Sequence, residues 1–260
     1  MKFVLNIFKI GGGILDHGAD LLEFVRLFAQ VGGPKILVHG GGKGASELMH
    51  RLGLAPNVVN GRRITDAATL DIVTMFYAGK TNKQLVAALQ ARGTNALGLS
   101  GADGNVLLAT RRPAREIDYG FVGDLSTASV NADLIDQLLA QGLTPVFCAI
   151  THDGHGQLLN TNADTVAAAI AKALSRRYSV ALHFCFEKKG VLLDMNDDSS
   201  VIEKISLADF SELKESGAIS AGMLPKVENA FDALQFGVDT VLIEHALHFN
   251  EPLKTTLCLV

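Results

Sequence analysis

Apolar runs of strand length alternate with helix-like segments along the whole chain, and this alternation constrains the fold more than any other feature of the sequence. Strand patterns are expected at residues 3–8, 35–39, 95–100, 144–150, 178–186 and 238–244. Helical patterns lie between them, at residues 19–31, 44–53, 66–91, 131–141, 163–174, 207–215 and 226–236. Parallel strands require such crossovers, and strands covered on both faces read as continuous apolar runs. We therefore expect an α/β fold, a three-layer αβα sandwich around a central, mostly parallel sheet.

Composition argues against several classes of partner. The 260 residues carry 23 Lys and Arg against 27 Asp and Glu, a net charge of −4, so no basic face for nucleic acid is implied. The apolar runs are too short to cross a bilayer, and residues 1–8 lack the pattern of a secretory leader. The three scattered cysteines are typical of buried, reduced thiols. We expect a single cytoplasmic domain that binds neither nucleic acid nor membrane.

Two glycine triplets follow the first two strand patterns, and each lies beside a lysine. Lys9 precedes the triplet at 11–13, and Lys43 follows the triplet at 40–42. Ligands of parallel sheets bind beyond the carboxyl ends of the strands, where such loops converge. Backbone N–H groups without Cβ atoms can close around an anion there. Either triplet alone could be a tight strand-to-helix turn, but two of them favour a bound phosphate or carboxylate.

The second triplet partly matches known loop types. A P-loop requires Ser or Thr after its lysine, whereas Gly44 follows Lys43. Gly40, Gly42 and Ala45 match the G-x-G-x-x-A dinucleotide pattern. However, the dinucleotide pattern requires an Asp or Glu about 20 residues later to bind the ribose, and this chain has a segment with two arginines there. An NAD(P)-binding dehydrogenase stays open as an alternative.

Polar residues also mark the starts of two later helical patterns. Asn160, Asn162 and Asp164 alternate as an extended segment would, and Asp164 stands where a helix begins. It either caps that helix or serves a site. Lys226 begins another helix, where the helix dipole disfavours a cation. A lysine in that place suggests an anionic ligand.

With these stretches assembled, the sequence resembles the amino acid kinase family and, within it, the acylglutamate kinases. The matching stretches, in the family's order, are "KIGGGIL", "LVHGGGKGASELM", "VNGRRITD", "GLSGADG", "YGFVGD", "LLAQGLTPVFCAI", "LLNTNADTVAAAIA" and "SAGMLPKVENA". The glycine loops fit several kinases of the family, whereas "NGRRIT" and "LLNTNAD" are more specific to the acylglutamate branch. The resemblance implies the carbamate kinase-like fold over residues 1–260. It also implies an acylglutamate-binding and dimerisation lobe at 1–177 and a nucleotide-binding lobe at 178–260.

The same resemblance implies a reaction, the ATP-dependent phosphorylation of the side-chain carboxylate of N-acetyl-L-glutamate, or of another N-acyl-L-glutamate such as N-succinyl, in arginine biosynthesis. Mg²⁺ would come with ATP, carried mainly by the nucleotide phosphates, with no protein metal ligands. Lys9 would hold the transferring phosphoryl group, Lys226 would neutralise charge on the leaving side, and Asp164 would orient both lysines.

The resemblance assigns the binding residues as well. Phosphate would be bound by Gly11 and Gly12. The substrate would be bound by Gly41, Gly42, Arg63 and Asn160, with Arg63 on the α-carboxylate. The nucleotide would be bound by Glu187, Lys188, Lys189, Gly190, Val191, Leu192, Ala218, Ile219 and Ser220.

Two departures from the family pattern bear on function. The family usually has Ser or Thr followed by Asp in the nucleotide loop, where this chain has Phe186 and Glu187. Arg62 stands where the family usually has an uncharged residue. It is either a solvated surface arginine or it faces the acyl pocket. In the pocket it would meet a second carboxylate, such as that of an N-succinyl group.

Other readings remain open within the family and beside it. Glutamate, carbamate and uridylate kinases share the glycine loops, and a catalytically inactive ligand sensor would share the fold. Arginine-inhibited relatives carry an extra N-terminal helix, for which the strand pattern at 3–8 leaves no room. We expect an arginine-insensitive homodimer whose interface is built from the helix at 66–91.

Overall fold

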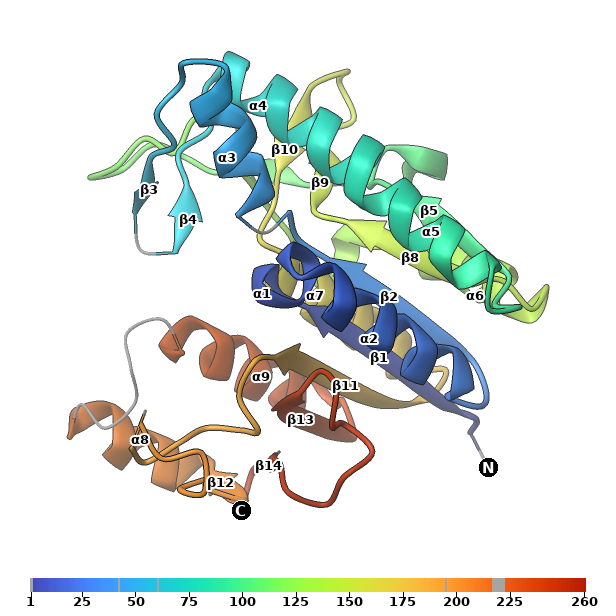
Figure 1. The fold of residues 1–260 in the computed structure, drawn as a ribbon, viewed down its shortest axis with the longest axis vertical. Helices are drawn as coiled ribbons and strands as arrows, with labels where there is room; N and C mark the ends of the chain where they lie inside the picture. Colours follow the sequence, from blue (N-terminus) through green and yellow to red (C-terminus); the bar gives the residue numbers. More distant parts are fainter. Residues whose placement is uncertain (1, 42, 60, 195, 217–222) are drawn as a thin grey trace.

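An eight-stranded sheet forms the centre of the molecule (Figure 1). The computed structural model describes residues 2–41, 43–59, 61–194, 196–216 and 223–260. In spatial order the strands are β12 (Lys204–Ser206), β14 (Thr255–Cys258), β13 (Thr240–His245), β11 (Ser179–Phe186), β1 (Val4–Ile10), β2 (Lys35–His39), β8 (Thr144–Cys148) and β5 (Ala96–Leu99). Neighbours are parallel except β13 and β14, which are antiparallel. The mostly parallel sheet expected from the sequence is confirmed.

Helices cover both faces of this sheet, because successive side chains of each strand point to opposite faces. Leu5 and Ile7 of β1 belong to one apolar core, and Phe8 and Ile10 to a second. The helices that contribute to the first core include α6 (Ala132–Ala140), α7 (Ala163–Leu174), α8 (Leu207–Glu215) and α9 (Leu224–Phe236). Those that contribute to the second are α1 (Gly12–Asp16), α2 (Gly18–Gln30) and α5 (Asn82–Gln90). The three-layer αβα sandwich is therefore confirmed.

The helix expected at 66–91 contains a π-helical turn. Asp66 caps its start, since its carboxylate accepts a hydrogen bond of 2.8 Å from the backbone N–H of Thr69. The segment then runs as α4 (Ala67–Thr74), the π-helical η1 (Met75–Thr81) and α5. The periodicity of the sequence predicted one continuous helix and gave no sign of the π turn.

Three small two-stranded sheets lie near the carboxyl ends of β2 and β8, on the side of α3 (Gly44–Arg51) and α4 (Figure 1). They pair β3 (Val58–Val59) with β4 (Arg62–Arg63), β6 (Thr110–Arg111) with β7 (Gly123–Asp124), and β9 (Ile150–His152) with β10 (Leu158–Asn160). Short 3₁₀ turns, η2 (Asp103–Asn105) and η3 (Thr127–Ser129), lie among them. The single strand expected at 144–150 is thus divided between β8 and β9.

The strands at one edge of the sheet were not expected from the sequence. β12 and β14 are short, and their buried residues include Ile205, Thr255 and Leu257. The expected lobe border at 177 falls just before β11, which pairs with β1 from Val4↔Ser179 to Ile10↔Cys185. The division into two lobes stays a prediction. Among the described residues, no helix is long and apolar enough to span a membrane.

Candidate active site

Two charged side chains from distant segments meet at the carboxyl ends of the parallel strands. Lys9 lies near the end of β1, and Asp164 lies in the first turn of α7. Lys9 Nζ is 2.9 Å from Asp164 Oδ1, and the two side chains are 11% and 15% exposed. The strand and the helix thus hold a largely buried ion pair in place.

Asp164 is not the cap of its helix. Asn162 is the N-cap residue, and its side-chain oxygen accepts hydrogen bonds from the backbone N–H groups of Asp164 at 2.7 Å and Thr165 at 3.2 Å. The alternative in which Asp164 merely caps the helix is therefore wrong. Because Asn162 satisfies the helix end, the carboxylate of Asp164 is left to face Lys9.

Lys226, near the start of α9, adds a second positive charge to this pair. Its Nζ lies 4.4 Å from the centre of the Phe186 ring. Burial lowers the pKa of Lys226 and the charge of Lys9 adds to this, while Asp164 and Glu187 oppose it. Burial alone would raise the pKa of Asp164, but Lys9 and Lys226 outweigh it and hold that pKa below its ordinary value.

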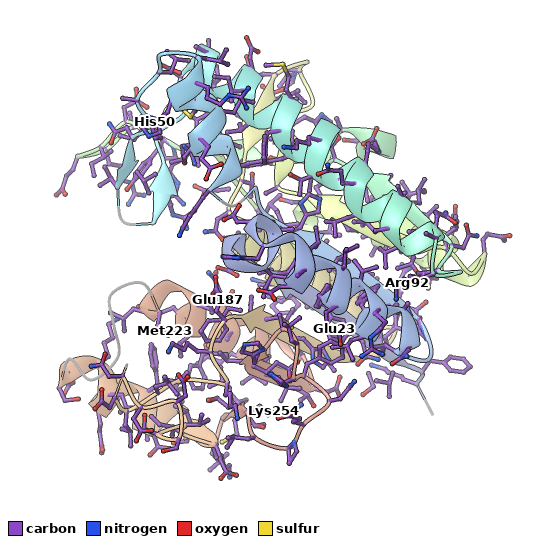
Figure 2. All side chains as sticks on the ribbon, viewed as in Figure 1. Glu23, His50, Arg92, Glu187, Met223 and Lys254 are labelled. Atoms are coloured by element: carbon purple, nitrogen blue, oxygen red, sulfur yellow. The ribbon has the colours of Figure 1, made fainter. Side chains whose placement is uncertain are left out.

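The first glycine triplet begins the short helix α1 instead of forming a loop. Gly11 is its N-cap, and a Cβ placed there would lie 3.7 Å from Lys9 Nζ. A Cβ at Gly13 would lie 1.3 Å from Oε1 of Glu187. Figure 2 shows Glu187 between α1 and Met223, the residue before α9. The Glu187 carboxylate thus lies directly against the backbone of Gly13, and a larger residue there would displace it.

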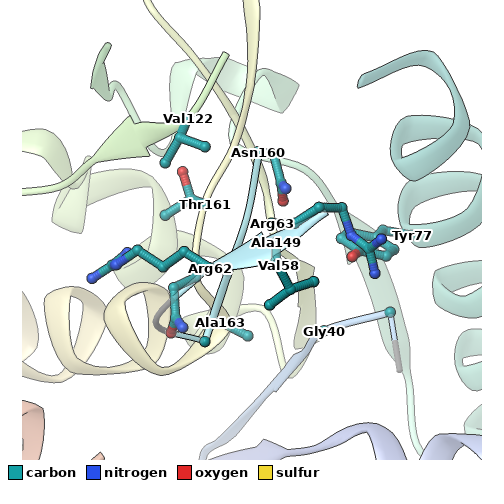
Figure 3. Close-up of a pocket in the computed structure, with 13 residues that line it drawn as sticks. Gly40, Val58, Arg62, Arg63, Tyr77, Val122, Ala149, Asn160, Thr161 and Ala163 are labelled. Carbon is teal, nitrogen blue, oxygen red and sulfur yellow. The ribbon is translucent and has the colours of Figure 1, made fainter. Parts of the chain in front are cut away.

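A pocket of about 220 Å³ lies beside this charged group (Figure 3). It is lined by Gly40, Gly41, Val58, Gly61, Arg62, Arg63, Tyr77, Val122, Ala149, Asn160, Thr161, Asn162 and Ala163. Three expected substrate residues, Gly41, Arg63 and Asn160, thus share one cavity. Asn160 is fixed by a hydrogen bond of 3.0 Å from its Nδ2 to Thr65 Oγ1.

Arg63 is held against α3, and one of its nitrogens is buried without a hydrogen-bond partner. Its Nη2 donates to Ser46 Oγ at 2.8 Å, and its Nη1 contacts Met49 Sδ at 3.3 Å. Its Nε is buried and has no hydrogen-bond partner. A buried donor without a partner is costly in a protein interior, so this nitrogen is suited to receive a ligand oxygen.

The second triplet is fixed by a neutral histidine. Asn82 Nδ2 lies 3.1 Å from Nε2 of His39, whose Nδ1 lies 2.8 Å from the carbonyl oxygen of Gly40. Burial lowers the pKa of His39 to about 4, so the ring is uncharged at neutral pH. The neutral ring can then accept from Asn82 and donate to Gly40, which orients the loop that lines the pocket.

Tyr77 is a pocket residue that sequence reasoning missed. A Cβ at Gly41 would lie 1.5 Å from Cε1 of its ring, so the ring lies directly against the glycine backbone. Tyr77 comes from the π-helical segment, and a helical pattern alone would place it among core residues. The glycine at 41 was the only available signal, since it required something to approach the backbone closely.

Arg62 lines the same pocket, where its guanidinium and that of Arg63 extend to different sides (Figure 3). Burial lowers the pKa of Arg62, and the nearby charge of Arg112 adds to this. Arg112 has its own partner, since its Nη2 lies 2.5 Å from Asp124 Oδ1. No ion pair forms on Arg62 among the residues that the structure describes.

The expected nucleotide segment is only partly turned toward the site. Lys188 pairs with Asp198 at 2.7 Å on the surface, and Lys189 is half-buried. Gly190 packs against Thr255, Val191 and Leu192 are buried, and the backbone N–H of Val191 donates to Thr255 Oγ1 at 2.8 Å. Glu187 is the member of this segment that reaches the glycine-rich helix. Four further expected residues lie outside the described part of the chain: Gly42, Ala218, Ile219 and Ser220.

Lys43, the lysine of the second triplet, does not join the charged group. Its side chain is exposed, and its backbone N–H donates to Asp16 Oδ2 at 2.9 Å. The lysine that joins Lys9 is Lys226, from the other end of the chain.

Comparisons with known proteins agree with this arrangement. The model of the amino acid kinase family matches residues 5–245. An acetylglutamate kinase from Bacteroides thetaiotaomicron is 52% identical over 94% of this chain and 94% of its own. The smu.665 protein of Streptococcus mutans UA159 has a solved structure with 29% identity and a TM-score of 0.78, over 92% of this chain and 94% of that one.

A more distant structure shares only the fold. A carbamate kinase from Giardia lamblia bound to AMP-PNP gives a TM-score of 0.70 at 15% identity, over 98% of each chain. The family match over residues 5–245 and the 52% identical relative point to the same group of proteins. The chain belongs to the amino acid kinase family, and within it to the group that includes the acetylglutamate kinases.

Proposed function

We propose that this protein transfers the γ-phosphoryl group of ATP to the side-chain carboxylate of an N-acyl-L-glutamate, as the name of its 52% identical relative indicates. The product is an acyl phosphate, and the step belongs to arginine biosynthesis. The main support in the structure is the Lys9–Asp164 ion pair beside Lys226, next to a pocket lined by Arg63.

The chemistry suits these residues because a carboxylate is already a nucleophile and needs no general base. Catalysis then consists of positioning the two substrates and neutralising the charge of the transferring group. Lys9 holds the phosphoryl group in flight, and Lys226 neutralises charge that develops on the leaving side. Asp164 is a positioning residue, because its carboxylate fixes Lys9 at 2.9 Å and offsets the mutual repulsion of the two lysines.

The glycine-rich helix binds the ATP phosphate, and the pocket binds the acylglutamate. Gly11 and Gly12 offer backbone N–H groups beside Lys9, on the phosphate side. Gly41, Arg63 and Asn160 lie on the acylglutamate side, where the guanidinium binds the α-carboxylate. ATP brings Mg²⁺ on its phosphates, where the ion neutralises part of their charge. The enzyme works in the cytoplasm as a homodimer.

A panel of acceptors tests this function. ADP release would be measured with ATP and, in turn, N-acetylglutamate, N-succinylglutamate, unmodified glutamate and carbamate. We expect ADP release to depend on an N-acylated glutamate. Equal or faster turnover of unmodified glutamate or carbamate would contradict the proposal, and so would an absence of turnover with all four.

Arg62 bears on the identity of the acyl group. Like Arg63 it forms no ion pair among the described residues, and burial next to Arg112 makes its charge costly. A second carboxylate on the acyl group would offset that cost. We therefore propose that the pocket accepts a dicarboxylic acyl group such as N-succinyl and favours it over N-acetyl.

The acyl preference is measured as kcat/KM for the two acylated glutamates. In Arg62→Leu we expect kcat/KM for N-succinylglutamate to fall about tenfold or more, since a hydrogen bond to a charged group is lost, with little change for N-acetylglutamate. Arg115→Leu, on an exposed loop, is the matched control. A clear preference of the unmodified enzyme for N-acetylglutamate would contradict this assignment and leave the kinase function intact.

A further inference from the structure

Tyr77 forms part of the pocket wall and also packs in the first apolar core. It is 7% exposed, and its ring lies on the backbone of Gly41, so no other side chain separates it from the substrate loop. It lines the cavity together with Arg63, and Figure 3 shows the two side by side. Its hydroxyl oxygen accepts a hydrogen bond from the Arg63 side chain, so its own O–H can donate to a ligand.

Tyr77 belongs to the π-helical turn η1, which places its ring against Gly41. Before it, Leu70 and Val73 of α4 are buried, and after it Leu85 and Leu89 of α5 are buried again. Both helices therefore keep their apolar faces toward the protein. The wider turn between them lets Tyr77 reach the glycine loop. Single π turns inside α-helices are rare and are frequent at functional sites.

Arg63, the neighbour of Tyr77 in the pocket wall, has a buried nitrogen without a partner. Two of its nitrogens are occupied by Ser46 and Met49, which leaves the buried Nε without a partner. Burial raises the pKa of Tyr77, with the Arg63 charge opposing it, so the phenol keeps its proton at neutral pH. Arg63 and Tyr77 thus bring a guanidinium and a phenol to the wall of the same small cavity. Two donors of this kind match the two oxygens of a carboxylate.

Resting on the proposed function, we propose that the Tyr77 hydroxyl is a substrate-binding group that shares the α-carboxylate of the N-acylglutamate with Arg63 Nε. The α-carboxylate fits this corner because the γ-carboxylate must lie near Lys9, which is not one of the residues that line the pocket. Tyr77 then acts on substrate affinity and not on the phosphoryl transfer itself.

The test compares two ligands in the unmodified protein and in Tyr77→Phe. Dissociation constants are measured calorimetrically without ATP for the N-acylglutamate and for the matching N-acyl-4-aminobutyrate, which lacks only the α-carboxylate. We expect Tyr77→Phe to weaken binding of the N-acylglutamate about tenfold, because a hydrogen bond to a charged group is lost. Binding of the truncated ligand should change little.

Tyr178→Phe is the matched control, since Tyr178 donates to Asp136 at 2.5 Å and does not line the pocket. It should leave both dissociation constants unchanged. The ratio of the two constants is taken within one protein, so a loss of stability in a variant does not alter it. In steady state, Tyr77→Phe should raise KM for the acylglutamate and leave kcat near normal.

Two outcomes would overturn the role of Tyr77. One is equal weakening of both ligands, which would place the hydroxyl on another part of the substrate or in a purely structural role. The other is unchanged binding of the full substrate. The kinase function is judged separately, by turnover of the unmodified protein, so its failure is distinguishable from a failure of this inference.

Discussion

Lys9, Asp164 and Lys226 form a group with one more positive charge than negative, in a place with little access to water. The ion pair fixes Lys9, and burial lowers the pKa of Lys226. The unbalanced positive charge is stabilised when an anion arrives, which is the condition for binding a transferring phosphoryl group. Each of these residues therefore has its own experimental signature.

Replacing Lys9 by alanine should reduce turnover far more than it reduces substrate affinity. The ammonium would act on charge that develops during transfer, so kcat is expected to fall about 10²–10³-fold while KM changes little. Lys43→Ala, at the exposed lysine of the other triplet, is the control and should retain normal kcat. Near-normal turnover in Lys9→Ala would refute the role of Lys9.

Replacing Asp164 by asparagine should change the pH dependence of turnover. Asp164 now raises the pKa of Lys226 against the opposing effects of burial and Lys9. Without that charge the pKa of Lys226 falls further, and the ammonium loses its proton at a lower pH. The alkaline limb of the kcat profile should therefore move to lower pH. An alkaline limb that stays in place would show that Lys226 does not depend on Asp164.

At the scale of elements, a buried network on β11 and β13 ties the sheet to the C-terminal segment. Glu244 is completely buried between His183 Nδ1 at 2.6 Å and Lys254 Nζ at 2.9 Å. Nε2 of His183 lies 3.2 Å from Asn6 Oδ1 on β1. Figure 2 shows Lys254 in the lower half of the molecule, on the side of the β13–β14 edge. The network joins three neighbouring strands to the segment that precedes β14.

Removing Glu244 should destabilise the protein strongly, because Lys254 and His183 would lose a buried partner. For Glu244→Ala we expect the free energy of unfolding in urea to fall by about 3 kcal/mol or more. Glu251→Ala removes an exposed partner of His248 and should change it by less than about 1 kcal/mol. Equal effects of the two substitutions would contradict a buried ionic network.

The contact between the second glycine triplet and η1 gives a prediction of its own. In Gly41→Ala the new Cβ would overlap the Tyr77 ring, so the ring must move and stability should fall by about 1–3 kcal/mol. KM for the acylglutamate should rise as well. Gly79→Ala, in the same π-helical segment with open space around it, should be neutral or stabilising. Normal KM in Gly41→Ala would contradict the close packing.

Helices and strands of this fold can be predicted from the sequence where the capping residues and the apolar pattern agree. The helices at 163–174 and 207–215 match α7 and α8 at both ends, because their starts are marked by Asn162 and Ser206. The π turn could not be predicted from the sequence, since its residues keep an ordinary helical pattern. β12 and β14 were missed because strands of three and four residues are too short to show alternation.

At the scale of the whole molecule, the candidate site depends on which strands become neighbours. β1 carries Lys9 and lies in the middle of the sheet, between β2 and β11. Segments that begin at residues 163 and 224 bring Asp164 and Lys226 to the same edge. The residues of the candidate site were assigned from their resemblance to a family, and their roles stay predictions. The Tyr77 contact and the unpartnered Nε of Arg63 could not be predicted, because they arise from packing between segments far apart in sequence.

The most direct test of the account is to trap the product. The protein would be incubated with ATP, an N-acyl-L-glutamate and hydroxylamine, which converts an acyl phosphate into a hydroxamate and releases phosphate. N-acyl-L-glutamine, which has no side-chain carboxylate, is the matched control and should give none. We expect a hydroxamate at the side-chain carboxyl group, equal in amount to the ADP formed and absent in Lys9→Ala. Release of ADP without hydroxamate, or a hydroxamate at the α-carboxyl group, would contradict it.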